Sequence, residues 1–368
     1  MNTLGRLFRV SLFGESHGHG VGVLVDGVPA GIPFGVEDVQ PELDRRRPGQ
    51  SLLTTQRQEG DRVEIQSGVH EGRTTGAPVL MLIRNEGQRS QDYAKAPTVP
   101  RPGHSDYPAR ERFGGWNDPR GGGMFSGRLT ACHVMAGALA QKLLDAHGVQ
   151  VAAHTTRIGS IATPRTFTVA QIRETVERTP VRCADLDAAK AMEEEILQAR
   201  AAKDSVGGIV ECIVEGLPVG WGEPNADSVE SLLAHAIFSV PATKGLEFGD
   251  GFRFAERRGS EASDPYYRDE AGRVRTRANH NGGILGGITT GMPLVFRVAF
   301  KPTSSIAVPQ PTLDLATGEP TPLQVTGRHD PCIVPRAVPV VEGVARMVLA
   351  DVLLMHAALR PREVKREW

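Results

Sequence analysis

The sequence predicts a fold that mixes β-strands with α-helices. Two segments near the start, 7–13 and 21–26, are short and apolar, and a glycine-rich turn separates them, as in a pair of strands. Two later segments, 126–146 and 339–359, carry apolar residues at helical spacing. A chain of 368 residues can bury a large core, and its length alone suggests about two domains.

The other elements follow from the same patterns. Pro48 and Gly49 end a short amphipathic helix, and Thr168 with Gln171 has the form of a capping box at the start of another. These two helices are expected at 36–43 and 168–178, and two more at 184–202 and 228–238. Further strands are expected at 63–66, 79–83, 149–154, 206–214 and 294–300. The middle of the chain therefore looks like a scaffold without chemistry, followed by a polar insertion at 259–277.

The segment 101–130 carries the strongest sign of a functional site. Arg101 and Arg128 offer rigid forks of donors that match phosphate or carboxylate oxygens, and His104 can transfer a proton near neutral pH. Gly121–Gly123 let the backbone approach a ligand, and the helix that follows offers its N-terminus to an anion. A lone glycine triplet is more often a surface loop with a helix cap. The cations and the histidine around it favour an anion site with an acid–base group.

Four other loops carry residues typical of ligand binding. His17 lies in a tight turn, where the alternative is a histidine that faces solvent. Of the arginines 45–47, Arg45 is expected in solvent, whereas an interior anion could bind one or two of the others. Residues 301–305, a lysine and three hydroxyls at a strand end, could cradle a phosphate. The glycine pairs of 279–287 do not form a GxGxxG dinucleotide fingerprint.

Composition limits the class of protein. The formal net charge of −1 gives no reason to expect nucleic-acid binding, and no apolar run approaches the ~20 residues that span a bilayer. The N-terminus is too short and too interrupted by arginine for a signal peptide. The four cysteines are scattered, and none of the eleven histidines lies in a metal-binding motif, so no metal is expected. We expect a soluble cytoplasmic protein with reduced thiols.

The motifs together resemble the chorismate synthase family. GESHG, RRRPG with TTQR, RPGHSDY, RGGG followed by SGR, NHNGGILGGI, KPTSSI and GRHDPC occur in that family's order and spacing, across roughly residues 4–358. The resemblance implies conversion of 5-enolpyruvylshikimate 3-phosphate to chorismate and phosphate by 1,4-elimination, with reduced FMN and no net redox change. It also implies a cytoplasmic homotetramer. Each chain would be a single α+β domain over residues 1–368, a β-α-β sandwich with helices packed between antiparallel sheets, in place of the two domains suggested by length.

The resemblance assigns roles to particular residues. His104 would assist the departing phosphate, His17 would protonate the reduced flavin, and Asp330 would assist removal of the ring hydrogen. The substrate's anionic groups would be bound by arginines from separate loops, namely Arg47, Arg57, Arg101, Arg128 and Arg328. The flavin contacts would come from Arg46, Ser126, Gly127, Arg128, Pro241, Ala242, Gly286, Lys301, Pro302, Thr303, Ser304, Ser305 and Arg328.

The chain departs from a frequent family pattern at a few positions. Met124 and Phe125 replace an arginine and a serine, Leu129 replaces a glutamate, and Leu52 stands where many members have an arginine. If that arginine helps to hold NADPH, this protein depends on an external flavin reductase for reduced FMN. Two alternatives are an NAD(P)H-dependent flavin reductase and a non-catalytic FMN- or anion-binding protein. The second does not need the two histidines and Asp330 as well, which argues against it.

Overall fold

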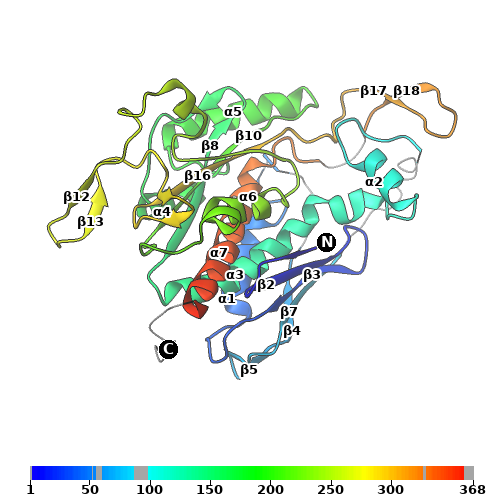
Figure 1. The fold of residues 1–368 in the computed structure, drawn as a ribbon. Coiled ribbons are helices and arrows are strands. Elements are labelled where there is room, and N and C mark those ends of the chain that lie inside the picture. The colour runs from blue at the N-terminus through cyan, green and yellow to red at the C-terminus, as the bar shows by residue number, and fades with distance from the viewer. Residues whose placement is uncertain (1, 52, 55–59, 87–97, 326–328, 360–368) are drawn as a thin grey trace.

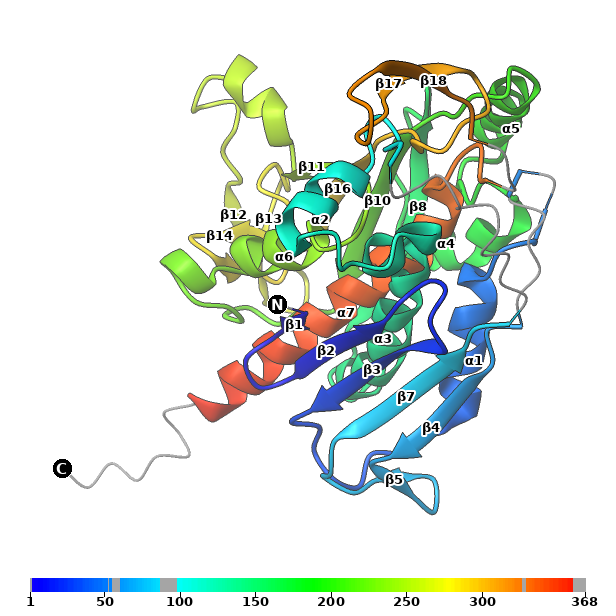
Figure 2. The same ribbon diagram turned by 90° about the vertical axis from the view of Figure 1, so that its right-hand side faces the viewer.

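The computed structural model describes residues 2–51, 53–54, 60–86, 98–325 and 329–359. Two antiparallel five-stranded sheets form its frame (Figures 1 and 2). The first sheet has the order β1 (Thr3–Leu4), β2 (Arg9–Gly14), β3 (Gly20–Asp26), β7 (Val79–Arg84) and β4 (Val63–Ser67). The second sheet has the order β11 (Thr243–Phe248), β16 (Leu294–Phe300), β10 (Gly208–Glu215), β8 (Gln150–Ile158) and β9 (Ile161–Ala162).

Three helices lie between the sheets: α1 (Val36–Arg46), α3 (Thr130–Asp145) and α7 (Val334–Ala358) (Figure 1). The first sheet turns the valines of β3, Val21, Val23 and Val25, toward α3, and all three are fully buried. The other side of the helical layer is α7, which packs on β8 and β10. The predicted α+β class and the β-α-β sandwich are therefore confirmed. One continuous apolar core joins both sheets and the helices, which supports the single domain that remains a prediction.

Shorter elements surround this frame. On the outer side of the second sheet, α4 (Val169–Thr175) and α5 (Leu186–Ala201) pack against β8, while α6 (Val229–Ile237) packs on α7 and β11. The helix α2 (Asp106–Phe113) lies in the loop region before α3. Four small hairpins complete the strands: β5 (Val69–His70) with β6 (Arg73–Thr74), β12 (Tyr266–Arg268) with β13 (Val274–Thr276), β14 (Ile284–Leu285) with β15 (Ile288–Thr289), and β17 (Gln310–Leu313) with β18 (Pro320–Leu323).

Several expected boundaries were wrong. The segment expected as one helix from 126 begins with a 3₁₀ turn, Gly127–Leu129, because Ser126 is extended and its hydroxyl accepts the Arg128 N–H. The last helix begins at Val334 rather than Pro339, since Pro335 takes the first-turn position that suits a proline. The polar insertion contains the β12–β13 hairpin, and α2 was missed altogether because it has almost no apolar face.

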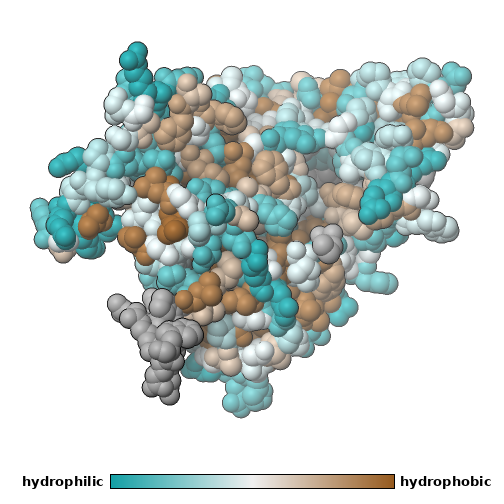
Figure 3. Space-filling model, in the orientation of Figure 1, coloured by the Kyte–Doolittle hydropathy of each residue, from teal (hydrophilic) through white to brown (hydrophobic). Residues whose placement is uncertain are grey.

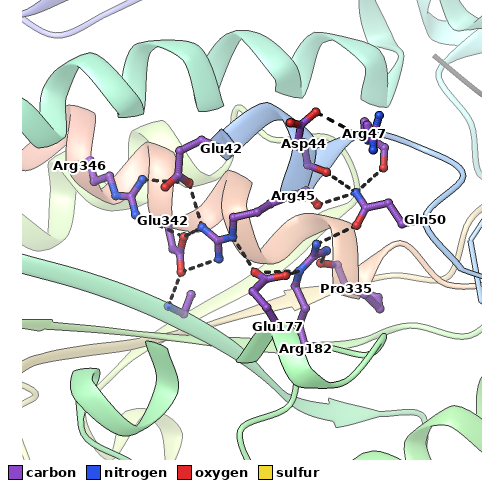
Figure 4. Close-up of polar contacts among 11 residues, drawn as sticks. Glu42, Asp44, Arg45, Arg47, Gln50, Glu177, Arg182, Pro335, Glu342 and Arg346 are labelled. Atoms are coloured by element: carbon purple, nitrogen blue, oxygen red, sulfur yellow. Dashed lines mark hydrogen bonds and ion pairs between the residues drawn. The ribbon is translucent and has the colours of Figure 1, made fainter. Parts of the chain in front are cut away.

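Pro339 lies inside α7 and has no backbone N–H, so one carbonyl of the preceding helix turn loses its usual donor. A side chain from another segment supplies the missing hydrogen bond. That carbonyl belongs to Pro335, and Arg182 Nη1 donates to it at 2.8 Å (Figure 4). Arg182 Nη2 also donates to Gln50 Oε1 at 3.0 Å, and Gln50 Nε2 in turn donates to three carbonyls at the end of α1. One guanidinium thereby holds the start of α7 against the end of α1.

A cluster of ion pairs between α1 and α7 corrects the expectation that Arg45 lies in solvent. Its guanidinium contacts Glu342 and Glu177 at 2.6 Å and Glu42 at 2.8 Å (Figure 4). Burial alone would raise the pKa of Glu42, but the charges of Arg346 and Arg45 outweigh it and hold that pKa below its usual value. Breaking such buried pairs is costly, so the cluster fixes how the two helices align.

The contact between α3 and α7 depends on two glycines. A Cβ atom added to Gly137 would lie 2.3 Å from the Cα atom of Gly343, and one added to Gly343 would lie 2.7 Å from the carbonyl oxygen of His133. Neither distance is compatible with a methyl group, and the neighbouring atoms are backbone that cannot rotate away. The two helix backbones therefore touch directly at this point.

We expect Gly137→Ala to destabilise the fold. Overpacking against backbone should cost about 3 kcal/mol, which exceeds the gain of roughly 1 kcal/mol in helix propensity. Urea unfolding should therefore show a net loss of about 2 kcal/mol. Gly259→Ala is the matched control, because a Cβ there meets no atom within 4 Å, and it should stay within about 0.5 kcal/mol of the parent. Equal stability of Gly137→Ala and the parent would contradict the direct helix contact.

Candidate active site

A cavity of about 730 Å³ opens where the ends of the second sheet meet the starts of α3 and α7. Its wall is made of the glycine-rich loop before α3, the loops after α6 and β16, and the first turn of α7. This volume is typical of small-molecule sites. The sequence-predicted residues that line it are Arg46, Arg101, His104, Ser126, Gly127, Arg128, Pro241, Ala242, Lys301, Pro302, Thr303, Ser304, Ser305 and Asp330.

Other predicted residues lie elsewhere. Arg57 and Arg328 fall outside the described residues, as does Leu52. Arg47 is the C-cap of α1, and its half-exposed side chain lies beside Asp44 rather than in the cavity wall. Gly286 is in the exposed turn between β14 and β15 and does not line the cavity of this chain. Substrate binding by Arg47 and flavin binding by Gly286 therefore remain predictions.

The glycine triplet allows two histidines to approach the same loop. Gly121, Gly122 and Gly123 all have positive φ, at 60°, 85° and 52°, which other residues rarely adopt. A Cβ on Gly121 would lie 2.5 Å from Cδ2 of His17, and one on Gly122 would lie 3.2 Å from Cε1 of His104. The triplet is therefore required both for its backbone path and for the space that the histidines occupy.

His104 sits in a compact polar group with Arg101 and Asp106. Its Nδ1 lies 2.7 Å from Asp106 Oδ1, and Arg101 pairs with the same carboxylate through Nε at 2.7 Å and Nη2 at 2.8 Å. Burial would raise the pKa of Asp106, but hydrogen bonds from Arg101 and His104 outweigh it and hold the pKa well below its usual value. Sequence reasoning missed Asp106, although its position two residues after the histidine was a usable signal.

Asp61 is a second carboxylate that sequence reasoning missed. It is fully buried and pairs with Arg46 Nη1 at 3.2 Å and with Arg128 Nη1. Arg46 also donates to the Gly127 carbonyl at 2.6 Å, and Arg128 Nε donates to Asn85 at 3.0 Å. Burial would raise the pKa of Asp61, but the charges of these two arginines outweigh it and lower the pKa. Asp61 thus holds both guanidinium groups in place at the cavity wall.

The loop after β16 places hydroxyls and a cation on the other side of the cavity. The Lys301 ammonium contacts the carbonyl of Gly103 and lies 3.0 Å from Ser304 Oγ, which also donates to that carbonyl at 2.7 Å. Arg101 Nη1 donates to Ser305 Oγ at 3.0 Å. Burial, with a smaller contribution from Lys244, lowers the pKa of Lys301. These contacts fasten the loop to the segment that carries His104.

Two further features mark this wall as functional. Ala242 has a φ of 68°, a conformation that is uncommon outside glycine and costs of order 1 kcal/mol or more. The Lys301 N–H donates to the Ala242 carbonyl at 3.0 Å and helps to hold this backbone. Asp330 forms an ion pair of 2.6 Å with Arg336, whose Nε donates to the Arg46 carbonyl at 3.1 Å. Arg336, in the first turn of α7, was also missed from the sequence.

The arrangement can bind a ligand with several anionic groups and offer it a proton. Four arginines and two lysines reach one cavity from separate segments: Arg46, Arg101, Arg128, Arg336, Lys244 and Lys301. The loop 301–305, with its hydroxyls and the ammonium, has the chemistry of a phosphate cradle. These residues fit the phosphate of a flavin mononucleotide together with an anionic substrate. Among the described residues, no group of three His, Cys, Asp or Glu side chains could hold a metal ion.

The buried carboxylate between Arg46 and Arg128 gives a prediction for stability. Asp61→Asn should lower the free energy of unfolding by about 3–5 kcal/mol at pH 7, because it removes the buried carboxylate that both buried arginines share. Since the pKa of Asp61 is lower in the folded state, its contribution is complete above its unfolded pKa and is lost as pH falls through the folded pKa. Urea unfolding from pH 7 downward should show the two proteins converging.

Asp44→Asn is the control for this experiment. Asp44 pairs with Arg47 at 3.7 Å, and both side chains are nearly half exposed, so the expected loss is below about 1 kcal/mol. If Asp61→Asn behaved like Asp44→Asn at every pH, the assigned role of Asp61 would be refuted.

Comparisons with known proteins identify the family of this chain. The family model described as chorismate synthase matches residues 8–354. Chorismate synthase of Methanocella arvoryzae is 50% identical over 98% of this chain and 96% of its own length, and that of Dehalococcoides mccartyi is 49% identical over 99% of each. A crystal structure of a chorismate synthase superposes with a TM-score of 0.75 at 28% identity, over 95% of this chain and 93% of that one. The chain therefore belongs to the chorismate synthase family.

Proposed function

We propose that this protein is a chorismate synthase, a lyase that removes phosphate and a ring hydrogen from 5-enolpyruvylshikimate 3-phosphate by 1,4-elimination. Chorismate made in this way is the product of the last step of the shikimate pathway, which leads to aromatic amino acids. The observation that carries the proposal is the convergence of Arg101, His104, Arg128 and Asp330 on one cavity, which agrees with the family membership.

The substrate brings one phosphate and two carboxylates, so binding needs several cations in a fixed arrangement. Arg101 and Arg128 are held by buried carboxylates, which fixes their donors before a ligand arrives. Arg47, Arg57 and Arg328 would add donors from their own loops. Because the guanidinium groups are already ordered, little side-chain entropy is lost on binding.

His104 is the group best placed to assist the leaving phosphate. It lines the cavity on the side of Lys301 and the loop 301–305, and it can hold a proton on its ring until the C–O bond breaks. Asp330, from the loop before α7, is proposed to assist removal of the ring hydrogen, with Arg336 fixing the direction of its carboxylate. His17, buried against Gly121, is proposed to supply a proton to the cofactor.

Reduced FMN is the proposed cofactor. When bound, it supplies an electron-rich ring that makes loss of the phosphate feasible without net oxidation. Lys301, Thr303, Ser304 and Ser305 would hold it with Ser126, Gly127, Arg46 and the turn Pro241–Ala242. Gly286 and Arg328 are included in the proposal on the resemblance alone. In place of the arginine and serine of the frequent family pattern, Met124 and Phe125 make this part of the wall apolar.

An anaerobic assay tests the activity. The purified protein with 5-enolpyruvylshikimate 3-phosphate and chemically reduced FMN should form chorismate, followed by its absorbance. NADPH with oxidised FMN should give no product until a flavin reductase is added, because Leu52 stands where many members have an arginine. Absence of product with reduced FMN and substrate both present would disprove the proposal. Unaided reduction of FMN by NADPH would instead favour a built-in reductase.

We also propose a cytoplasmic homotetramer. Large apolar side chains are exposed on this chain, among them Trp116 at 92% and Phe252 at 83%. In Figure 2 the strands of the first sheet turn a face away from the helices, and Phe13 and Leu24 are partly exposed on it. Brown apolar areas also interrupt the hydrophilic surface in Figure 3. None of the described helices is long and apolar enough to cross a membrane.

Sedimentation should give a mass about four times the 39.6 kDa of the chain. The expected reason is burial of exposed apolar surface between copies, which stabilises association. An active monomer at micromolar concentration would rule out the tetramer as a requirement for the site.

A further inference from the structure

Asp106 is held more tightly than a surface carboxylate at the start of a helix would be. Its side chain is only 9% exposed, and both oxygens accept hydrogen bonds. Oδ2 accepts from the Arg101 backbone N–H at 3.0 Å and from Arg101 Nε at 2.7 Å. Oδ1 accepts from Arg101 Nη2 at 2.8 Å and lies 2.7 Å from His104 Nδ1. The carboxylate therefore has one orientation, and that orientation presents Oδ1 to the imidazole.

The hydrogen bonds that hold this group extend to the adjacent loop after β16. Arg101 Nη1 donates to Ser305 Oγ at 3.0 Å, so the guanidinium that fixes Asp106 is itself fixed to the loop after β16. The same loop holds Gly103 through Lys301 and Ser304. Because these contacts join two segments some 200 residues apart, His104 and the proposed phosphate cradle keep a constant separation.

Three groups lie within hydrogen-bond distance of His104 Nδ1: Asp106 Oδ1, Arg101 Nη2 and, farther away, Ser105 Oγ at 3.4 Å. Asp106 Oδ1 lies 2.7 Å away and can only accept, whereas Arg101 Nη2 lies 3.1 Å away and can only donate. Arg101 Nη2 already donates to Asp106 Oδ1 at 2.8 Å, and the carboxylate distance is the shorter one. The geometry therefore favours a proton on Nδ1. The other nitrogen, Nε2, lies close to Gly122, where an added Cβ would be 3.4 Å from it, and His104 lines the cavity together with the neighbouring Gly121.

We propose that Asp106 is a positioning residue that keeps the Nδ1 proton on His104 and presents Nε2 to the leaving phosphate. The proposal rests on the chorismate synthase activity proposed above. In the step it serves, the proton on Nε2 passes to a phosphate oxygen while the C–O bond breaks and its electron pair leaves with the phosphate. The imidazole ends neutral, with its Nδ1 proton still directed at Asp106, which remains ionised throughout.

The charged groups around His104 come from several elements. Its own loop supplies Asp106 and Arg101, and Lys301 is the cation at the end of β16. The rest of the cavity wall adds Arg46, Arg128, Lys244, His329, Asp330 and Arg336. Of these, Asp106 is the carboxylate in contact with the imidazole, so its removal should act on the histidine more directly than a change to any of the others.

Asp106→Asn tests the proposal, because the carboxamide has only one oxygen. We expect the Arg101 guanidinium to donate to that oxygen. The NH2 of the carboxamide would then donate to His104 Nδ1, and the single proton of the neutral imidazole would move to Nε2. Nitrogen-15 shifts of histidine-labelled protein at alkaline pH distinguish the protonated from the bare ring nitrogen, with His104→Gln used to assign the signal. We expect a protonated Nδ1 in the parent and a bare Nδ1 in the variant. The same protonated nitrogen in both proteins would overturn the proposal.

Kinetics give a second readout. Asp106→Asn should lower kcat by about 10- to 100-fold with little change in KM, and the alkaline limb of the kcat profile should move to lower pH, since the imidazolium loses its carboxylate. Asp106→Glu should recover part of the loss. If the parent makes chorismate and Asp106→Asn keeps the parent kcat and pH profile, the positioning role is wrong and the proposed function stands. If the parent makes none, the proposed function fails and the positioning role falls with it.

Asp38→Asn is the matched control. Asp38 also lies in the first turn of a helix, α1, and pairs with Lys142 at 2.9 Å, but it does not line the cavity. Asp38→Asn should change thermal stability about as much as the loss of another surface ion pair does. It should leave kcat and the pH profile of kcat intact. A shift of the pH profile in both variants would show that the effect of Asp106 is a general loss of structure, which would also overturn the proposal.

Discussion

The direct contact between the backbones of α3 and α7 is the constraint on which the site depends. Both helices begin at the cavity: α3 follows the glycine loop, and α7 follows the loop of Asp330. Because Gly137 and Gly343 allow no side chain between the helices, the separation of their starting points is fixed by backbone. The loops that carry His104, Arg128 and Asp330 are therefore positioned by the core rather than by their own interactions alone.

Buried ion pairs also fix how the helices align with one another. The ion pairs of Arg45, Glu342, Glu42 and Arg346 fix α1 against α7, and Arg182 closes the gap that Pro339 leaves in the helix ladder (Figure 4). Buried ion pairs add little stability compared with apolar packing, but they penalise any misaligned arrangement. At the end of α1 this alignment matters for function, since Arg46 follows Arg45, pairs with Asp61 and lines the cavity.

The sequence could predict the layers and most of the cavity wall. Apolar periodicity identified α3, most strands of both sheets and the body of α7, but it missed β1, β9 and β11. The motifs identified Arg101, His104, Arg128 and the loop 301–305. The sequence could not predict α2, which has almost no apolar face, or the partners Asp61 and Arg336, whereas the position of Asp106 two residues after His104 was a signal that went unused. A carboxylate becomes a positioning group only when folding brings an arginine to it. Asp61 meets arginines 15 and 67 residues away, and no local pattern signals that.

The same pairing limits how the site can recognise a ligand. Arg101 is matched by Asp106, Arg336 by Asp330, and Arg46 with Arg128 by Asp61, so each guanidinium already faces a carboxylate. These pairs make it possible to bury several arginines at one wall, but they also weaken the long-range attraction of the site for an anion. Affinity must then come from donors directed at fixed points in the cavity. We therefore expect a ligand whose phosphate and carboxylates match those points to bind more tightly than a simple anion of equal charge. The carboxylates therefore make the site selective for the arrangement of negative charge.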